Sequence, residues 1–142
     1  MNGSKKYFLD ANIFLRVFIR EHVPSFLDCS KILQLIQDGK ISAVINTLVF
    51  AEVGWVLGRL YKFSKHEVIM ALNSMAQLKN LSIYDRHDVL LGLSLYGQYN
   101  VKFIDAMIAA NDVISIWKAP IISYDKDFDK LGVKRVVPSD LL

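Results

Sequence analysis

Short apolar runs alternate along the chain with longer segments in which apolar residues recur at helical spacing. A short run without a polar face predicts a strand buried on both sides, and helical spacing predicts an amphipathic helix. The predicted strands are residues 5–9, 41–45, 120–123 and 133–137, and a further brief apolar patch covers residues 81–83. The predicted helices are residues 12–20, 24–38, 48–61, 64–78, 86–99 and 103–114, and residues 125–130 form a turn or a short helix.

Local signals support this alternation. Ser64 and Glu67 have the spacing of a capping box, in which each side chain accepts the backbone N–H of the other residue. Gly39 ends the helix predicted over 24–38, since glycine is common just past a helix C-terminus. Thr47 is the expected N-cap of the helix after the second strand. Strands that alternate with helices predict a three-layer α/β/α sandwich around a mostly parallel sheet of four to five strands. We expect residues 1–142 to form one domain.

Composition narrows the class of protein. The chain has 142 residues, 53% hydrophobic and 22% charged, which is typical of a globular domain and not of a disordered one. No uncharged stretch reaches the roughly 20 apolar residues that cross a bilayer, and the N-terminus shows no signal-peptide core. We therefore expect a cytoplasmic protein with no membrane partner. The single cysteine, Cys29, excludes an intramolecular disulfide, and the net charge of +3 permits a polyanionic partner without requiring one.

Four acidic residues stand where the predicted fold has few charges. Asp10 ends the first strand, and Asp125 closely follows the strand at 120–123. Glu52 and Asp105 each interrupt an apolar stretch early in a predicted helix. In a parallel sheet, ligands bind outside the carboxyl ends of the strands. We therefore expect the four carboxylates to meet at that edge.

Each acid taken singly also has an ordinary structural explanation. Asp10 or Asp125 could be the N-cap of the next helix. Asp105 could be stabilised by the helix dipole near a helix start. Glu52 could point outward between its apolar neighbours, or pair with a distant base such as Arg59. The set of four, rather than any single member, indicates a site.

Carboxylates gathered at one edge predict a bound cation. They repel each other and raise one another's pKa values, so the cluster is unfavourable unless a cation neutralises it. Ligands that are all oxygen favour Mg²⁺ or Mn²⁺ over zinc, and the histidines, His22, His66 and His87, are scattered in polar contexts. One or two such ions would activate water and stabilise the leaving oxygen in phosphodiester cleavage.

Four stretches of the chain each carry one or more of these acids. The stretches are residues 7–12, the surroundings of Glu52, residues 103–110 and residues 123–128. Together these stretches resemble the PIN-domain ribonucleases, and among them the VapC-type toxins of prokaryotic toxin–antitoxin pairs. Ala11 departs from the family pattern, in which many members carry Thr or Ser. The resemblance implies Mg²⁺- or Mn²⁺-dependent endonucleolytic cleavage of RNA, a homodimer, and a cognate antitoxin that covers the site.

The resemblance also implies roles for particular residues. The acids implied to be catalytic and to bind the metal are Asp10, Glu52, Asp105 and Asp125, with Asp127 as a fifth metal-binding acid. Asn12 and Ser123 are implied to support the site, although Asn12 is equally ordinary at a helix start. The basic residues that could contact RNA phosphates are Arg16, Arg20, Arg59 and Lys62. A solvated basic face is the ordinary explanation for these four.

Three functions are consistent with these residues. A metal-dependent endoribonuclease toxin uses all of the acids. A phosphotransferase or phosphatase with Asp10 as nucleophile is disfavoured, because the haloacid-dehalogenase type carries a second Asp where this chain has Asn12. Within this second function, a receiver domain is disfavoured as well, because it carries paired acids after its first strand. A non-catalytic PIN-like module that binds RNA or a partner protein is disfavoured by the retention of the acids.

Overall fold

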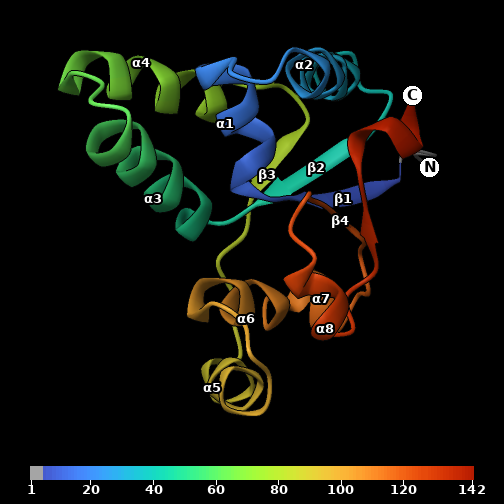
Figure 1. Cartoon of the computed structure of the whole chain (residues 1–142). Helices are drawn as coiled ribbons and strands as arrows, with labels where there is room; N and C mark the ends of the chain where they lie inside the picture. Colours follow the sequence, from blue (N-terminus) through green and yellow to red (C-terminus); the bar gives the residue numbers. More distant parts are fainter. Residues whose placement is uncertain (1–4) are drawn as a thin grey trace.

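Five parallel strands form the centre of the molecule (Figure 1). The computed structural model describes residues 5–142, and residues 1–4 of the predicted domain lie outside them. The strands are β1 (Lys6–Leu9), β2 (Ser42–Ile45), β3 (Leu81–Ile83), β4 (Ile121–Ile122) and β5 (Arg135–Val136). They lie in the order β3-β2-β1-β4-β5, and every neighbouring pair is parallel. The apolar patch at 81–83 is therefore an edge strand, and β1 lies at the centre.

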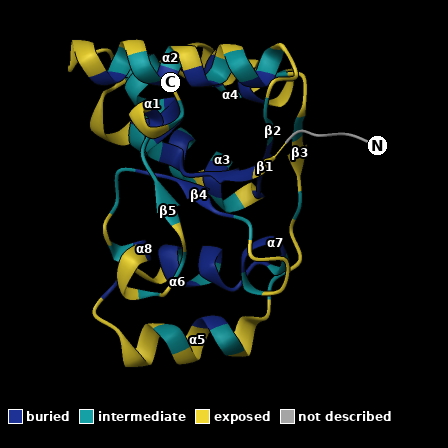
Figure 2. Ribbon diagram, turned by 90° about the vertical axis from the view of Figure 1, so that its right-hand side faces the viewer, coloured by how far each residue is buried: buried dark blue, intermediate teal, exposed yellow. Residues whose placement is uncertain are grey.

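Helices cover both faces of this sheet. The first group is α1 (Ala11–Ile19), α2 (Val23–Gln37), α3 (Thr47–Trp55) and α4 (Lys65–Ala76), with a π-helical extension of α3 at Val56–Leu60. The second group is α5 (Val89–Gln98), α6 (Phe103–Ala109), α7 (Asp112–Ser115) and α8 (Asp127–Lys130), followed by a 3₁₀ turn at Pro138–Leu141. In both ribbon views α1, α2 and α4 lie on one side of the sheet, and α5 to α8 lie on the other (Figures 1 and 2). The predicted α/β/α sandwich is confirmed.

The core lies along the central strands. Phe8 and Leu9 of β1 and Ile121 and Ile122 of β4 are fully buried, as the dark strands of Figure 2 show. Burying one such side chain contributes about 1.5–3 kcal/mol, so these unbroken apolar runs hold the sheet between its helices. No helix between residues 5 and 142 combines the length and the apolar character needed to cross a membrane.

The helix starts show where local signals succeed and where they fail. The capping box of α4 is confirmed, because Glu67 N donates to Ser64 Oγ (3.1 Å) and Ser64 N donates to Glu67 Oε1 (2.9 Å). The prediction of Thr47 as an N-cap is wrong. Asn46 caps α3 instead, with its Oδ1 accepting Val49 N at 3.0 Å. Asn46 is fully buried at the end of β2, so its polar side chain needs that hydrogen bond.

The second half of the chain departs further from the predicted helices. The helix predicted over 86–99 begins only at Val89, because Asp88 is its N-cap. The helix predicted over 103–114 is broken, and α7 starts after Asn111. The Asn111 side chain accepts Val113 N (3.0 Å) and donates to Tyr84 O (2.9 Å), so a tertiary contact fixes the break.

Helix α6, which carries Asp105, is held close to α5. Gly92 of α5 lies against Met107 of α6, where an added Cβ atom would overlap the Met107 sulfur. Glycine lets the two helices approach closely here, and a larger residue would need the Met107 side chain to shift. This packing fixes the position of α6, which carries Asp105, relative to α5.

Candidate functional site

Asp10 is the most completely hydrogen-bonded of the predicted acids. It follows β1, is 3% exposed and is the N-cap of α1, where Ala11 N donates to Oδ1 at 2.8 Å. Its other oxygen, Oδ2, accepts from Asn12 Nδ2 (3.1 Å) and from the Ser123 hydroxyl (2.5 Å). Burial raises the pKa of Asp10, while the hydrogen bonds from Ser123 and Ala11 oppose that rise. The N-cap explanation and a site role therefore apply to Asp10 together.

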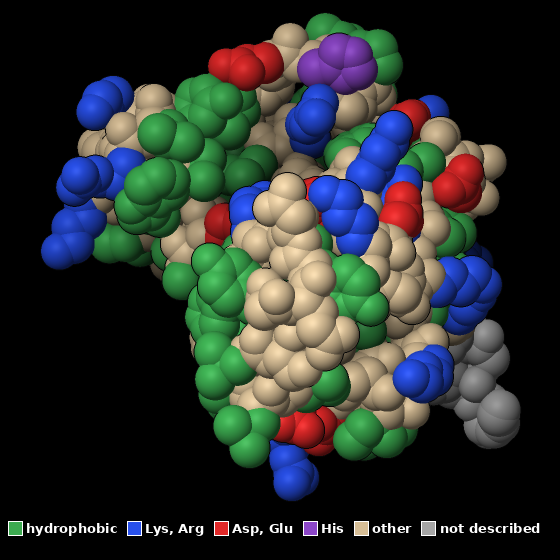
Figure 3. Space-filling view, turned by 60° about the horizontal axis from the view of Figure 1, so that its bottom comes forward, with side chains coloured by type: hydrophobic (Ala, Val, Ile, Leu, Met, Phe, Trp, Pro, Cys, Tyr) green, Lys and Arg blue, Asp and Glu red, His purple; other side chains and the backbone are tan. Residues whose placement is uncertain are grey.

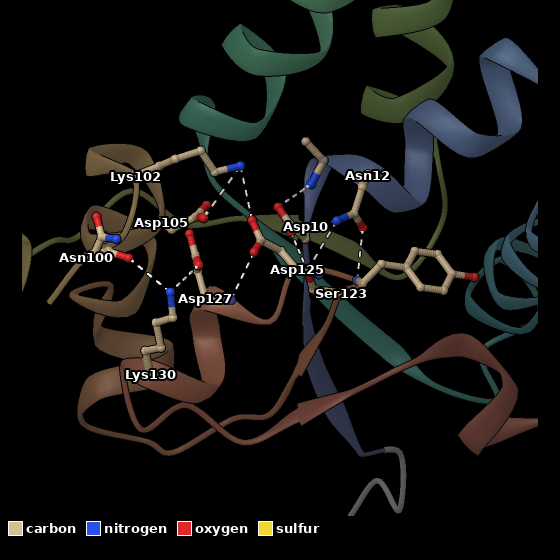
Figure 4. A network of polar contacts seen from close by, with 11 residues as sticks. Asp10, Asn12, Asn100, Lys102, Asp105, Ser123, Asp125, Asp127 and Lys130 are labelled. Atoms are coloured by element: carbon tan, nitrogen blue, oxygen red, sulfur yellow. Dashed lines mark hydrogen bonds and ion pairs between the residues drawn. The ribbon is translucent and has the colours of Figure 1, made fainter.

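Ser123 links two of the acids across the sheet. It lies directly after β4, next to β1, and its hydroxyl donates to Asp10 while accepting Asp125 N at 2.9 Å. Asn12 Nδ2 lies 3.3 Å from the same hydroxyl (Figure 4). The two residues predicted to support the site thus contact Asp10 directly and fix its orientation.

Three acids gather beside Asp10. Asp105 from α6, Asp125 from the loop after β4 and Asp127 from α8 each place an oxygen within 4.8 Å of the others. Asp127 N also donates to Asp125 Oδ1 at 2.9 Å. Elements far apart in the sequence therefore bring three of the five predicted metal-binding acids into one group, which Figure 4 shows beside Asp10.

Glu52, on α3, is near this group but not within it. Burial raises the pKa of Glu52, and the negative charges of Asp10 and Asp125 add to the rise. Within residues 5–142, Glu52 forms no ion pair, so the pairing with Arg59 that the sequence left open is not seen. Its Oε1 is buried and accepts no hydrogen bond from any described residue.

Asp105 has a second buried oxygen of this kind. Asp105 is 1% exposed, and its Oδ2 accepts no hydrogen bond in the described part of the chain. Burial and a hydrogen bond with Asp125 raise the pKa of Asp105 to about 8, although the nearby Lys102 ammonium opposes this. A carboxylate oxygen is normally hydrogen-bonded when it is buried, so Glu52 Oε1 has unused capacity to bind a cation. Asp105 Oδ2 also lacks a hydrogen bond, and the positive charge near it is the Lys102 ammonium group at 3.7 Å.

Two lysines that the sequence analysis did not single out contact the acids. Lys102 Nζ lies 3.1 Å from Asp125 Oδ2 and 3.7 Å from Asp105 Oδ2. Lys130 Nζ lies 3.5 Å from Asp127 Oδ1 and donates to a backbone carbonyl at 3.2 Å. Each lysine is three residues from an acid, a spacing that places side chains on one helix face and was the available signal.

The basic residues predicted to bind RNA lie in different places. Arg16 packs over the Tyr124 ring (5.0 Å to its centroid) and donates to Ser25 Oγ of α2. Arg20, at the far end of α1, packs over an aromatic ring of α2. Arg59 and Lys62 are exposed beyond α3. In Figure 3, Lys and Arg side chains lie among partly recessed acidic ones.

A pocket adjoins the acidic site on the α1 side. It has a volume of about 320 Å³, and its lining includes Asn12, Leu15, Arg16, Val56 and Tyr61. Because Asn12 also contacts Asp10, the pocket and the acids share a wall.

The fold and these side chains define an α/β protein with a carboxylate site at the carboxyl edge of a parallel sheet. The sequence model of the PIN domain matches residues 7–134, and the chain belongs to the PIN domain family. None of the curated proteins matches the sequence.

The fold is similar to solved structures of toxin–antitoxin proteins. A chain from Rickettsia felis VapBC2, crystallised with a promoter DNA fragment, has a TM-score of 0.67 and 14% identity over 93% of this chain and 98% of that one. A Klebsiella pneumoniae toxin–antitoxin complex gives 0.59 and 18%, over 93% and 97%. Mycobacterium tuberculosis VapC20, a sarcin–ricin loop cleaving toxin, gives 0.65 and 14%, over 93% and 99%. At these identities the likeness concerns the fold.

Proposed function

We propose that the protein is an endoribonuclease that depends on Mg²⁺ or Mn²⁺ and hydrolyses RNA phosphodiester bonds. The observation that carries this proposal is the pair of buried carboxylate oxygens, Glu52 Oε1 and Asp105 Oδ2, to which no described residue donates. Leaving a buried oxygen without a hydrogen bond costs about 1–3 kcal/mol, which the Lys102 ammonium group at 3.7 Å offsets in part at Asp105 Oδ2. A divalent cation would remove that cost at both oxygens. The donor set is all oxygen, which fits these hard ions.

The acids divide the work in this proposal. Asp10, Glu52, Asp105 and Asp125 hold one or two ions, and Asp127 adds a fifth carboxylate. A divalent ion held there supplies Lewis-acid activation of water and neutralises phosphate charge during hydrolysis. Ser123 and Asn12 keep Asp10 in one orientation through their hydrogen bonds.

A phosphoenzyme mechanism with Asp10 as nucleophile is less favoured. Both Asp10 oxygens already accept hydrogen bonds, from Ala11 on one side and from Asn12 and Ser123 on the other. A nucleophilic oxygen needs an open approach, whereas these donors hold both oxygens in place.

The proposed partners are RNA, a cognate antitoxin and a second copy of the chain. RNA is supported by the acids together with Arg16, which lines the same pocket as Asn12. The similar solved proteins include a toxin–antitoxin complex and a sarcin–ricin loop cleaving toxin, which supports a toxin role and an antitoxin partner. We place this activity in the cytoplasm.

The test is cleavage of total cellular RNA by the purified protein with Mg²⁺, Mn²⁺ or EDTA, beside two variants. Asp105→Asn removes a proposed metal ligand, and Asp38→Asn makes the same change at an exposed position at the end of α2. We expect metal-dependent cuts from the wild type and Asp38→Asn, and none from Asp105→Asn or in EDTA. RNA binding without metal-dependent cleavage would favour the non-catalytic module instead.

A further inference from the structure

We propose that Lys102 is a built-in counter-ion of the acidic site, and that its ammonium group must leave before a divalent cation can bind. This inference rests on the proposed metal site and adds a residue that weakens its metal affinity. The carrying observation is that one ammonium group contacts both Asp105 and Asp125, two of the three acids whose oxygens converge.

The contacts of Lys102 show what holds it. Lys102 precedes α6, and its Nζ lies 3.1 Å from Asp125 and 3.7 Å from Asp105 (Figure 4). Among the described residues, these two carboxylates are its only close polar partners. Its side chain is 59% exposed, so the ammonium group can move into water without unpacking the core. Lysine is a compact, strongly hydrated charge on a flexible stem, which makes such a movement inexpensive.

Two cations compete for the same oxygens. A divalent ion that takes one oxygen from Asp105 and one from Asp125 needs the space and the lone pairs that the ammonium group now uses. Two cations only a few ångströms apart repel each other even in water. Binding of the ion therefore requires the Lys102 ammonium group to move away from the two carboxylates. The free energy of breaking these ion pairs lowers the metal affinity.

Lys130 does not have the same role. Among the acids of residues 5–142, its ammonium group contacts Asp127 alone, at 3.5 Å, and it also donates to the carbonyl oxygen of Asn100. The oxygens of Asp105 and Asp125 are outside its contacts. Lys102 is therefore the lysine whose removal should change metal binding most.

The experiment is titration of Mn²⁺ into the purified full-length protein by calorimetry, with no RNA present. Lys102→Gln removes the proposed counter-ion, Lys102→Arg keeps its charge, and Lys31→Gln removes a charge from an exposed position on α2. We expect Lys102→Gln to bind Mn²⁺ about three- to tenfold more tightly. Lys31→Gln and Lys102→Arg should stay within about twofold of the wild type.

Melting temperatures in EDTA provide a second measurement. Without its counter-ion the acidic cluster repels itself, so Lys102→Gln should melt below the wild type in EDTA and gain more than the wild type from saturating Mn²⁺. Equal or weaker Mn²⁺ binding by Lys102→Gln would overturn this inference while leaving the metal site in place. Absence of Mn²⁺ binding in the wild type and in Lys102→Gln would instead overturn the proposed function.

Discussion

The carboxylates of this site fall into two kinds. Asp10, at the end of the central strand, has three hydrogen-bond donors around its two oxygens. Glu52 and Asp105, carried by helices on opposite sides of the sheet, each keep a buried oxygen with no donor from the described residues. The protein itself fixes the orientation of Asp10, whereas the other two carboxylates are incompletely satisfied. In the proposed function, Asp10 would then be a preorganised ligand, and Glu52 and Asp105 would supply the attraction for a cation.

Asp10→Asn should have the largest effect. The amide NH₂ group would face a donor, either Ala11 N or the pair formed by Asn12 and Ser123. We expect the metal-free protein to lose about 1–3 kcal/mol of unfolding free energy. RNA cleavage should fall by more than about 100-fold, since even an outer group around a metal site costs about 10–100-fold. Urea unfolding in EDTA and RNA cleavage in Mg²⁺ measure the two effects. An Asp10→Asn protein as stable as the wild type would show that the donors do not fix this carboxylate.

Ser123→Ala tests the orientation of Asp10 by removing a donor and keeping the carboxylate. The change removes one donor from Asp10 and the acceptor of Asp125 N while leaving every carboxylate in place. We expect Mn²⁺ affinity to fall by about tenfold, because the ligand remains but its orientation loosens. Calorimetry measures this, with Ser94→Ala at an exposed position of α5 as the matched control. An unchanged affinity would mean that backbone position alone orients Asp10.

Three of the acids, Asp10, Glu52 and Asp105, were open to prediction because each breaks an apolar pattern. Asp125 was chosen because it closely follows a strand, and Asp127 came from the resemblance alone. Asp10 ends a buried strand and Asp105 interrupts an apolar helix, and both signals are present in the sequence alone. Lys102 and Lys130 carry no such signal. Their one local signal is a spacing of three residues from an acid, and only the fold shows that each ammonium group lies within 4 Å of a carboxylate of the site.

The fold shows the same limit. The buried strands and the capping box of α4 follow from local chemistry, so the sequence was sufficient for them. The choice of Asn46 over Thr47 as an N-cap, and the break at Asn111, depend on contacts with distant residues. Both asparagines contact His87 Nε2, at 2.9 and 3.3 Å. Asn46 and Thr47 can both cap a helix, so the local pattern does not decide between them. The tertiary hydrogen bond with His87 favours Asn46.

The stability of the metal-free protein should depend on pH through Asp105. Its pKa is about 8 in the folded chain and 3.8 in an unfolded one. Between these values the folded state holds a proton that the unfolded state has released, so stability falls as pH rises through this window. We expect a lower melting temperature at about pH 8 than at about pH 5 in EDTA. Asp105→Asn should show a weaker decline, and an equal decline would assign the effect to another group.

Glu52→Gln should give the smallest effect and the opposite sign to Asp10→Asn. The neutral amide would have no charge to repel Asp10 and Asp125, and the wild-type Oε1 has no donor among the described residues to lose. We expect the unfolding free energy in EDTA to stay unchanged or to rise by up to about 1 kcal/mol. Mn²⁺ affinity should nevertheless fall, because a neutral amide is a poorer ligand for a hard cation than a carboxylate. A stability loss as large as that of Asp10→Asn would show that Glu52 is also held by the protein, and the distinction between the two kinds of carboxylate would fail.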